Sequence, residues 1–193
     1  MAGLSVAASA QKGPTDDADF SGWQSVGSGN WSAEGSELVG RPDPNKPGAG
    51  YMFTREVFTD FRLALLFNIS SGGTSGVYVR EPRRKWSATG DTRPGSGPAG
   101  GYLVSIDYQG RDNPTGTINN IQKSKKLVGG EGNWNEMEIV CRGSDIRVSI
   151  AGQNVNRFNQ LRVQPGVIGF ALPDGAPADF VVRFRNVVIS PVT

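Results

Sequence analysis

One stretch of nine residues, 61–69, alternates strictly between apolar and other side chains. The first set comprises Phe61, Leu63, Leu65, Phe67 and Ile69, and the second comprises Arg62, Ala64, Leu66 and Asn68. Successive side chains of a β-strand point to opposite faces, so this alternation predicts a long strand with one face in a core. Leu66 in the second set indicates that the other face is not fully exposed to solvent either.

The rest of the chain repeats this theme in shorter segments. Apolar or alternating runs occur at 51–54, 77–80, 102–108, 132–141, 145–150, 167–172 and 180–190. They are separated by turns rich in glycine and proline, which number 27 and 12 in 193 residues. No segment shows the apolar spacing of a helix of useful length. Many short strands predict an all-β fold, a two-sheet antiparallel β-sandwich, and the length suits one domain over residues 19–193.

The first 18 residues differ from this pattern. Residues 1–10 are mildly apolar and end in Ala-Ser-Ala, and residues 11–18 are polar. This composition resembles the end of a signal peptide, although it lacks a charged leading region. The alternatives are therefore a signal-peptide remnant, which implies a secreted or periplasmic protein, and a flexible arm. No apolar run approaches the ~20 residues that a membrane-spanning helix needs.

Composition excludes several classes of function. The net charge is only +2, so we expect no nucleic-acid partner. The chain has no histidine, which excludes every catalytic triad, metal site and acid–base scheme that needs imidazole. Its single cysteine, Cys141, is expected to be a small buried apolar residue. The glycines at 72–73 and 95–101 do not match the motif of a phosphate-binding loop. We expect neither a cofactor nor a metal site.

The strongest candidate for a site lies around residues 73–107. Two predicted strands flank a loop, 81–101, that has no periodicity, and a loop of this length is usually functional or disordered. Tyr78 and Arg80 have the same parity, so we expect them on one face of the sheet. Asp107 shares its parity with Ser105 and is expected to face the same groove. Arg80 is interpreted either as a surface or ion-paired arginine or as a planar donor to sugar hydroxyls or a carboxylate.

Tryptophans and paired carboxylates offer weaker candidates. Trp23, Trp31 and Trp134 sit at strand starts, where an indole is usually buried. Trp86 lies in the charged, irregular loop, where the indole either stacks on a sugar ring, anchors an interface or simply packs within the loop. Glu136 and Glu138 point away from Met137, Ile139 and Cys141 in the predicted strand. They are either a glycosidase pair or, as is more common, a solvated face.

A series of landmarks runs in order through nearly the whole chain. They are Phe20-Ser-Gly-Trp23, Trp31, Leu38-Val-Gly40, Thr59-Asp60-Phe61, Thr74-Ser-Gly-Val-Tyr-Val-Arg80, Gly101-Tyr102, Ile106-Asp107, Gly132-Asn-Trp-Asn-Glu-Met-Glu-Ile139, Gly166-Val-Ile-Gly169 and Val182-Arg-Phe-Arg-Asn-Val-Val-Ile189. This order resembles the 3-keto-disaccharide hydrolase family. The resemblance implies a concanavalin-like, or laminarinase-like, jelly roll of two antiparallel sheets.

The resemblance also implies a function, a carbohydrate-binding or carbohydrate-hydrolysing domain with a saccharide held on a sheet face near Arg80 and Asp107. Arg80 and Asp107 are then the catalytic candidates. The ligand-binding candidates are Tyr78, Arg80, Trp86, Tyr102 and Ser105. The family carries a glutamate and a glutamine where this chain has Leu103 and Ser105, so a retained enzyme and a pure binding module both stay open.

The alternative function is a non-enzymatic scaffold. In that case the β-sandwich serves assembly, and residues 1–18 and the 81–101 loop make contacts between the subunits of a homo-oligomer.

Overall fold

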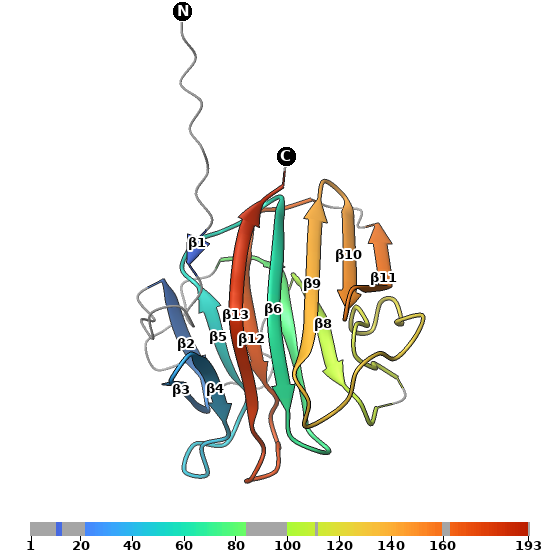
Figure 1. Cartoon of the computed structure of the whole chain (residues 1–193). Helices are drawn as coiled ribbons and strands as arrows, with labels where there is room; N and C mark the ends of the chain where they lie inside the picture. Colours follow the sequence, from blue (N-terminus) through green and yellow to red (C-terminus); the bar gives the residue numbers. More distant parts are fainter. Residues whose placement is uncertain (1–10, 13–21, 84–99, 111, 160–162, 193) are drawn as a thin grey trace, which may run out of the picture.

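The computed structural model describes residues 11–12, 22–83, 100–110, 112–159 and 163–192. These residues form two antiparallel sheets and no helix (Figure 1). The larger sheet has the strand order β11-β10-β9-β6-β13-β4-β3, and β1 pairs with β13. Its strands are β1 (Gln11–Lys12), β3 (Asn30–Glu34), β4 (Glu37–Arg41), β6 (Phe61–Ile69), β9 (Asn135–Arg142), β10 (Asp145–Ile150), β11 (Gln153–Asn159) and β13 (Val182–Pro191).

The smaller sheet has five strands in the order β2-β5-β12-β7-β8. They are β2 (Trp23–Gly27), β5 (Gly50–Thr54), β7 (Thr74–Glu81), β8 (Tyr102–Asp107) and β12 (Val167–Leu172). Each sheet therefore combines strands from distant parts of the chain. The predicted all-β, two-sheet sandwich is confirmed.

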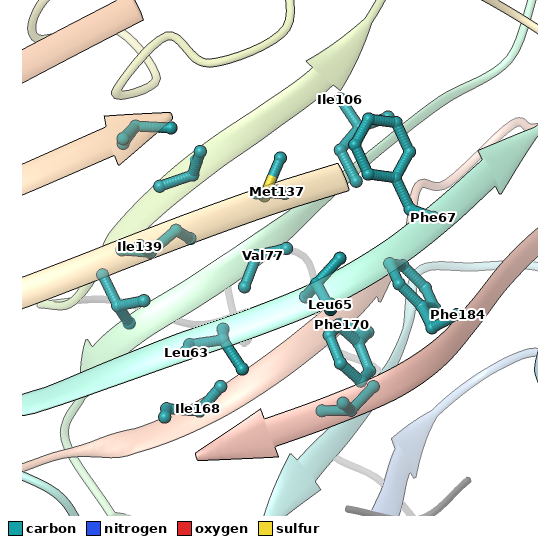
Figure 2. Close-up of a cluster of buried hydrophobic side chains, with 14 of the residues drawn as sticks. Leu63, Leu65, Phe67, Val77, Ile106, Met137, Ile139, Ile168, Phe170 and Phe184 are labelled. Carbon is teal, nitrogen blue, oxygen red and sulfur yellow. The ribbon is translucent and has the colours of Figure 1, made fainter. Parts of the chain in front are cut away.

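The core lies between the two sheets. The five apolar residues of β6 that share one parity are at most 2% exposed, so the predicted alternation is confirmed. Figure 2 shows Leu63 and Leu65 beside Ile168 and Phe170 of the opposite sheet, and Phe67 beside Ile106. The rings of Phe170 and Phe184 stack across the two sheets with centroids 4.0 Å apart. Burial of these large side chains is the main stabilising contribution to such a sandwich.

Two of the three tryptophans predicted for the core lie there or against it. Trp23 is 3% exposed and stacks on Phe170, and Trp31 packs beside Phe184. The prediction for Trp134 is wrong. Its ring is covered instead by the guanidinium of Arg185, 3.9 Å from the ring centroid.

Strand parity explains the position of Trp134. The inward positions of β9 are Met137, Ile139 and Cys141, all fully buried. Trp134 has the opposite parity and shares the outer face with Glu136 and Glu138. Glu138 accepts a hydrogen bond from Nε of Arg62, so these carboxylates belong to an ion-paired solvated face rather than to a pocket.

Part of the N-terminal segment is held by the larger sheet, since Gln11 and Lys12 pair with Ile189 and Val188 of β13. The remaining residues of 1–18 lie outside the described residues. Residues 84–99, with Trp86, do so as well. The proposed contacts between subunits fall mainly on these segments. Within the described part of the chain, no helix is long and apolar enough to cross a membrane.

Candidate functional site

A cleft of about 330 Å³ lies on the outer face of the five-stranded sheet. Strands β5, β7, β8 and β12 contribute to its lining. Its polar lining includes Tyr51, Tyr78, Ser105, Asp107, Asn119 and Asp174. The volume is at the lower end of the ~300–1,000 Å³ range typical of ligand pockets, which suits a small ligand.

Strand parity brings three of the predicted site residues into this cleft. In β8, Ser105 and Asp107 line the cleft, while Val104 and Ile106 are fully buried in the core. In β7, Tyr78 lines the cleft in the same way. The two strands are adjacent and antiparallel, so the side chains lie on one continuous surface.

Arg80 is not part of this surface. Its side chain is fully buried, and both Nε and Nη2 donate to the carbonyl oxygen of Thr59, at 3.0 and 2.6 Å. Nη1 donates to the carbonyl of Gly143 at 2.7 Å, and Nη2 also meets Oδ1 of Asp60 at 3.0 Å. The expectation that Tyr78 and Arg80 share a face is therefore wrong, and the ion-paired interpretation of Arg80 holds.

A β-bulge in β7 is the physical reason. Val167 of β12 pairs with Glu81, whereas Gly169 pairs with Tyr78, so β7 carries one extra residue between the two pairs. Arg80 has a φ of 53°, in the left-handed region. A bulge of this kind re-aims the side chains that follow it, and simple parity counting fails across it.

The other two candidates do not line the cleft among the described residues. Tyr102 packs on Phe158, with ring centroids 5.6 Å apart, at the margin of the core. Trp86 lies outside the described residues. Tyr78, Ser105 and Asp107 thus remain as the predicted residues that the fold brings together.

The Asp107 carboxylate already has a structural task. Its Oδ1 accepts hydrogen bonds from the backbone N–H groups of Gln109 and Gly110, at 2.9 and 2.6 Å. Aspartate commonly stabilises a turn in this way. A carboxylate offers about four lone-pair positions, so two accepted bonds leave it able to take further donors from a ligand.

Residues of the cleft that sequence reasoning missed include Tyr51, Asn119 and Asp174. The ring of Tyr51 meets that of Tyr78 edge to face, with centroids 6.0 Å apart. Burial raises the pKa of both hydroxyls, and the charge of Glu81 adds to the effect. Both tyrosines are therefore neutral at ordinary pH and able to donate a hydrogen bond. The strand at 51–54 offered no parity signal for Tyr51, because Met52 and Phe53 have opposite parity and are both buried. Asp174 lies in a turn with no periodicity.

The wall of the cleft beside β8 is a loop that docks on the strand edge. The N–H of Ser105 donates to the carbonyl of Thr117, and the N–H of Asn119 donates to that of Leu103, both at 2.9 Å. Oδ1 of Asn119 is buried and has no hydrogen-bond partner among the described residues. It is a buried acceptor in the lining of the cleft.

The buried Asn156 fixes this loop to β11. Its Nδ2 donates to the carbonyls of Gly116 and Gln122, at 3.0 and 2.9 Å. Its Oδ1 accepts from Nε2 of Gln122 at 2.7 Å. The cleft wall is thus set by side-chain hydrogen bonds rather than by a regular strand. Over the described ranges, no three Cys, Asp or Glu residues gather in a way that could hold a metal ion.

Solved structures share this fold. A protein from Parabacteroides distasonis, provisionally assigned as a glycosyl hydrolase, superposes with a TM-score of 0.64 at 20% identity, over 88% of this chain and 99% of its own. The carbohydrate-binding module CBM66 from Bacillus subtilis superposes with a TM-score of 0.63 at 17% sequence identity, over 88% of this chain and 95% of its own. The β-glucanase of Bacillus licheniformis superposes with a TM-score of 0.62 at 16% sequence identity, over 93% of this chain and 96% of its own. At these identities the likeness establishes the jelly-roll fold alone.

A search of curated protein sequences finds no significant match. Comparison with models of protein families confirms the family resemblance of the sequence landmarks. The sequence model of the 3-keto-alpha-glucoside-1,2-lyase-like domain matches residues 14–190, nearly the full length. This chain therefore belongs to the 3-keto-alpha-glucoside-1,2-lyase-like family, a family of carbohydrate-active jelly-roll domains.

Proposed function

We propose that this protein binds a small 3-keto-α-glucoside in the cleft on the outer face of the five-stranded sheet. One observation carries the proposal: this cleft gathers two neutral tyrosines, two carboxylates and an unpartnered amide oxygen, namely Tyr51, Tyr78, Asp107, Asp174 and Asn119. Binding pockets for small ligands combine an apolar lining with a few polar groups that fix orientation. The membership of the family supplies the class of ligand.

The chemistry of these groups suits a sugar. Carboxylates and the Asn119 oxygen accept hydrogen bonds from hydroxyl groups, and the tyrosine hydroxyls can donate to a ketone or a ring oxygen. The faces of the tyrosine rings offer apolar area for the C–H groups of a pyranose. A buried acceptor without a partner costs about 1–3 kcal/mol, and a sugar hydroxyl at Asn119 would remove that cost.

Binding is tested by calorimetric titration with methyl 3-keto-α-glucoside, in parallel with methyl α-glucoside. We expect Tyr78→Phe and Asp174→Asn each to weaken binding about tenfold, the equivalent of one hydrogen bond of ~1.4 kcal/mol. Glu136→Gln is the matched control, because Glu136 lies on the outer face of the other sheet and should leave affinity unchanged. Absence of binding by the native protein would refute the proposal.

Turnover of the bound ligand is a second candidate function, favoured by the presence of two carboxylates in one cleft. A ketone at C3 acidifies the proton on C2. A carboxylate can remove that proton while the C1–O bond breaks, C1 and C2 form a double bond, and a protonated second group returns a proton to the leaving oxygen. In a chain without histidine, Asp107 and Asp174 are the candidates for these two roles.

Proton transfer by a positioned side chain typically contributes ~10²–10⁴ in rate. If the cleft is catalytic, Asp107→Asn and Asp174→Asn should each lower turnover of methyl 3-keto-α-glucoside by a factor in this range, as followed by proton NMR. Binding of the ketone without any release of methanol would instead identify a binding module.

An exported location fits this proposal, since residues 1–10 resemble the end of a signal peptide. Cell fractionation with an antibody to the native chain tests it. Recovery in the cytosolic fraction alone would contradict it.

A further inference from the structure

The dipeptide Asp174-Gly175 has a chemical reactivity that the rest of the chain lacks. It is the only place in the sequence where an aspartate or an asparagine is followed directly by glycine. The backbone nitrogen of the residue after an aspartate can attack the side-chain carboxyl group. Glycine hinders this attack least, because it has no Cβ and its backbone moves most freely. The sequence therefore marks one position for a reaction between a side chain and the main chain.

The structure leaves this dipeptide accessible. Both residues are exposed, and they form the turn that follows β12. Among the described residues, no hydrogen bond or ion pair engages the Asp174 carboxylate, and the N–H of Gly175 has no hydrogen-bond partner. A Cβ built on Gly175 would meet nothing within 4 Å, so the nitrogen and the carboxylate are open to solvent.

Two other aspartates show what distinguishes this pair. Asp43 is followed by Pro44, which has no backbone N–H. Asp179 is exposed like Asp174, but the N–H of Phe180 donates to the carbonyl of Pro177 at 2.9 Å. The phenylalanine side chain also crowds the nitrogen that would have to attack. Asp179 is therefore an internal control, only a few residues from the reactive pair.

We propose that Asp174-Gly175 is a site of spontaneous isoaspartate formation in the wall of the cleft. The nitrogen of Gly175 forms a bond to Cγ of Asp174, and the bond from Cγ to its hydroxyl oxygen breaks. This oxygen leaves as water together with the amide proton, and the product is a succinimide ring. Water then opens the ring. Attack at Cγ restores aspartate, whereas attack at the main-chain carbonyl carbon gives isoaspartate, which has the mass of the native residue.

Isoaspartate changes the shape and charge of the cleft. The main chain then runs through the former side chain, which lengthens the turn by one methylene, and the free carboxylate is bonded directly to Cα. Asp174 lines the cleft close to Tyr51. Burial raises the pKa of the Tyr51 hydroxyl, and the charge of Asp174 adds to the effect. The reaction therefore moves a negative charge beside this tyrosine. Its effect on sugar binding rests on the proposed function, whereas the reaction itself does not.

Peptide mapping of the full chain tests the reaction. The native protein is incubated for several weeks in mildly acidic buffer, and a freshly purified sample serves as the reference. Trypsin releases residues 163–183 as one peptide, which carries both Asp174 and Asp179. Electron-transfer fragmentation breaks the Cα–Cβ bond of isoaspartate and so locates it. Methylation by an isoaspartate methyltransferase, with S-adenosylmethionine as the methyl donor, counts the modified chains.

Two variants provide matched controls. Gly175→Ala adds a Cβ that meets no neighbour but hinders the attacking nitrogen. Alanine is strained at the φ of 71° that Gly175 adopts, so a urea denaturation curve must show that this variant is folded. Asp174→Glu keeps the carboxylate and Gly175 itself, but its longer side chain must close a larger ring that forms much more slowly.

We expect isoaspartate to accumulate at residue 174 at least about tenfold faster than at residue 179, where a hydrogen bond equivalent to ~1.4 kcal/mol must break first. Both variants should slow the reaction at residue 174. Equal rates at residues 174 and 179, or the native rate in both variants, would overturn the inference.

The effect on the cleft is measured separately, by calorimetric titration of fresh and incubated protein with methyl 3-keto-α-glucoside. Affinity should fall in the converted chains and persist in the unconverted ones. Unchanged affinity after complete conversion would overturn the effect on binding. If the fresh protein binds no sugar, the proposed function fails, while the peptide map still decides whether isoaspartate forms at residue 174.

Discussion

Tyr78 and Arg80 are two residues apart in β7, yet their side chains lie in different places. Tyr78 lines the outer cleft, whereas the Arg80 guanidinium donates to backbone carbonyls in the loops that connect strands of the larger sheet. Thr59 lies just before β6, and Gly143 lies in the turn between β9 and β10. Arg80 therefore links the five-stranded sheet to the larger sheet. The bulge that separates the two residues turns the Arg80 side chain away from the cleft face and toward this link.

Replacement of Arg80 by methionine should destabilise the protein without acting on the cleft. Arg80→Met keeps most of the side-chain volume but leaves the carbonyls of Thr59 and Gly143 without their donors. We expect the free energy of unfolding to fall by about 2–5 kcal/mol, measured by urea denaturation as a lower midpoint at constant m-value.

Arg62→Met is the control, since Arg62 is 49% exposed on its side chain and pairs with Glu138 at the surface. Its cost should be at most about 1 kcal/mol. If Arg80→Met keeps the native midpoint and loses saccharide binding instead, Arg80 belongs to the binding site after all.

Two substitutions at Asp107 should distinguish its role in stabilising the turn from the role of its charge in the cleft. Asp107→Ala removes the acceptor for the N–H groups of Gln109 and Gly110 and should cost about 0.5–1.5 kcal/mol of stability. Asp107→Asn retains an oxygen acceptor and should stay close to native stability. Both should weaken binding of methyl 3-keto-α-glucoside. Native affinity in Asp107→Ala would show that the carboxylate serves the turn alone.

The tyrosines should ionise at a higher pH in the folded protein than in the unfolded chain. The chain has four tyrosines, and burial raises the pKa of Tyr51, Tyr78, Tyr102 and Tyr108, the last to about 12. Absorbance at 295 nm should therefore titrate above pH 10 in the native state and near pH 10 in urea. A native transition at the denatured midpoint would contradict the buried environment.

The same tyrosines link stability to alkaline pH. Above pH 10 the unfolded chain has released protons that the folded tyrosines still hold, so unfolding becomes more favourable as pH rises. For Tyr108 this contribution is fully present below pH 10 and is lost as pH rises through about 12. Urea midpoints measured at pH 8, 10 and 11 should fall in that order, and Tyr108→Phe should reduce the slope.

The single thiol should be unreactive in the native state. Cys141 is fully buried, and burial raises its pKa to about 12, so the reactive thiolate is scarce at pH 8. A disulfide reagent such as DTNB should label it only after denaturation, with one equivalent per chain. Rapid stoichiometric labelling of the native protein would show that the region around β9 opens readily.

Alternation in the sequence was sufficient for the architecture. The predicted bounds 61–69, 145–150 and 167–172 agree with β6, β10 and β12, and the prediction of two antiparallel sheets is confirmed. The reason is local: a strand buried on one face must place an apolar residue at every second position. Parity also sufficed to place Ser105 and Asp107 on one face of β8.

Only the tertiary structure decided the composition of the candidate site. The bulge at Arg80 depends on pairing with β12, a strand almost ninety positions further along the chain, and no local pattern reports it. Asp174 lines the cleft because it lies in the turn that directly follows β12. Tyr51 lines the cleft because its strand, β5, pairs with β12. The sequence by itself determined which residues of regular strands such as β6 face the core. Which side chains of β7 meet the cleft follows from long-range pairing, which is fixed only when the sheets assemble.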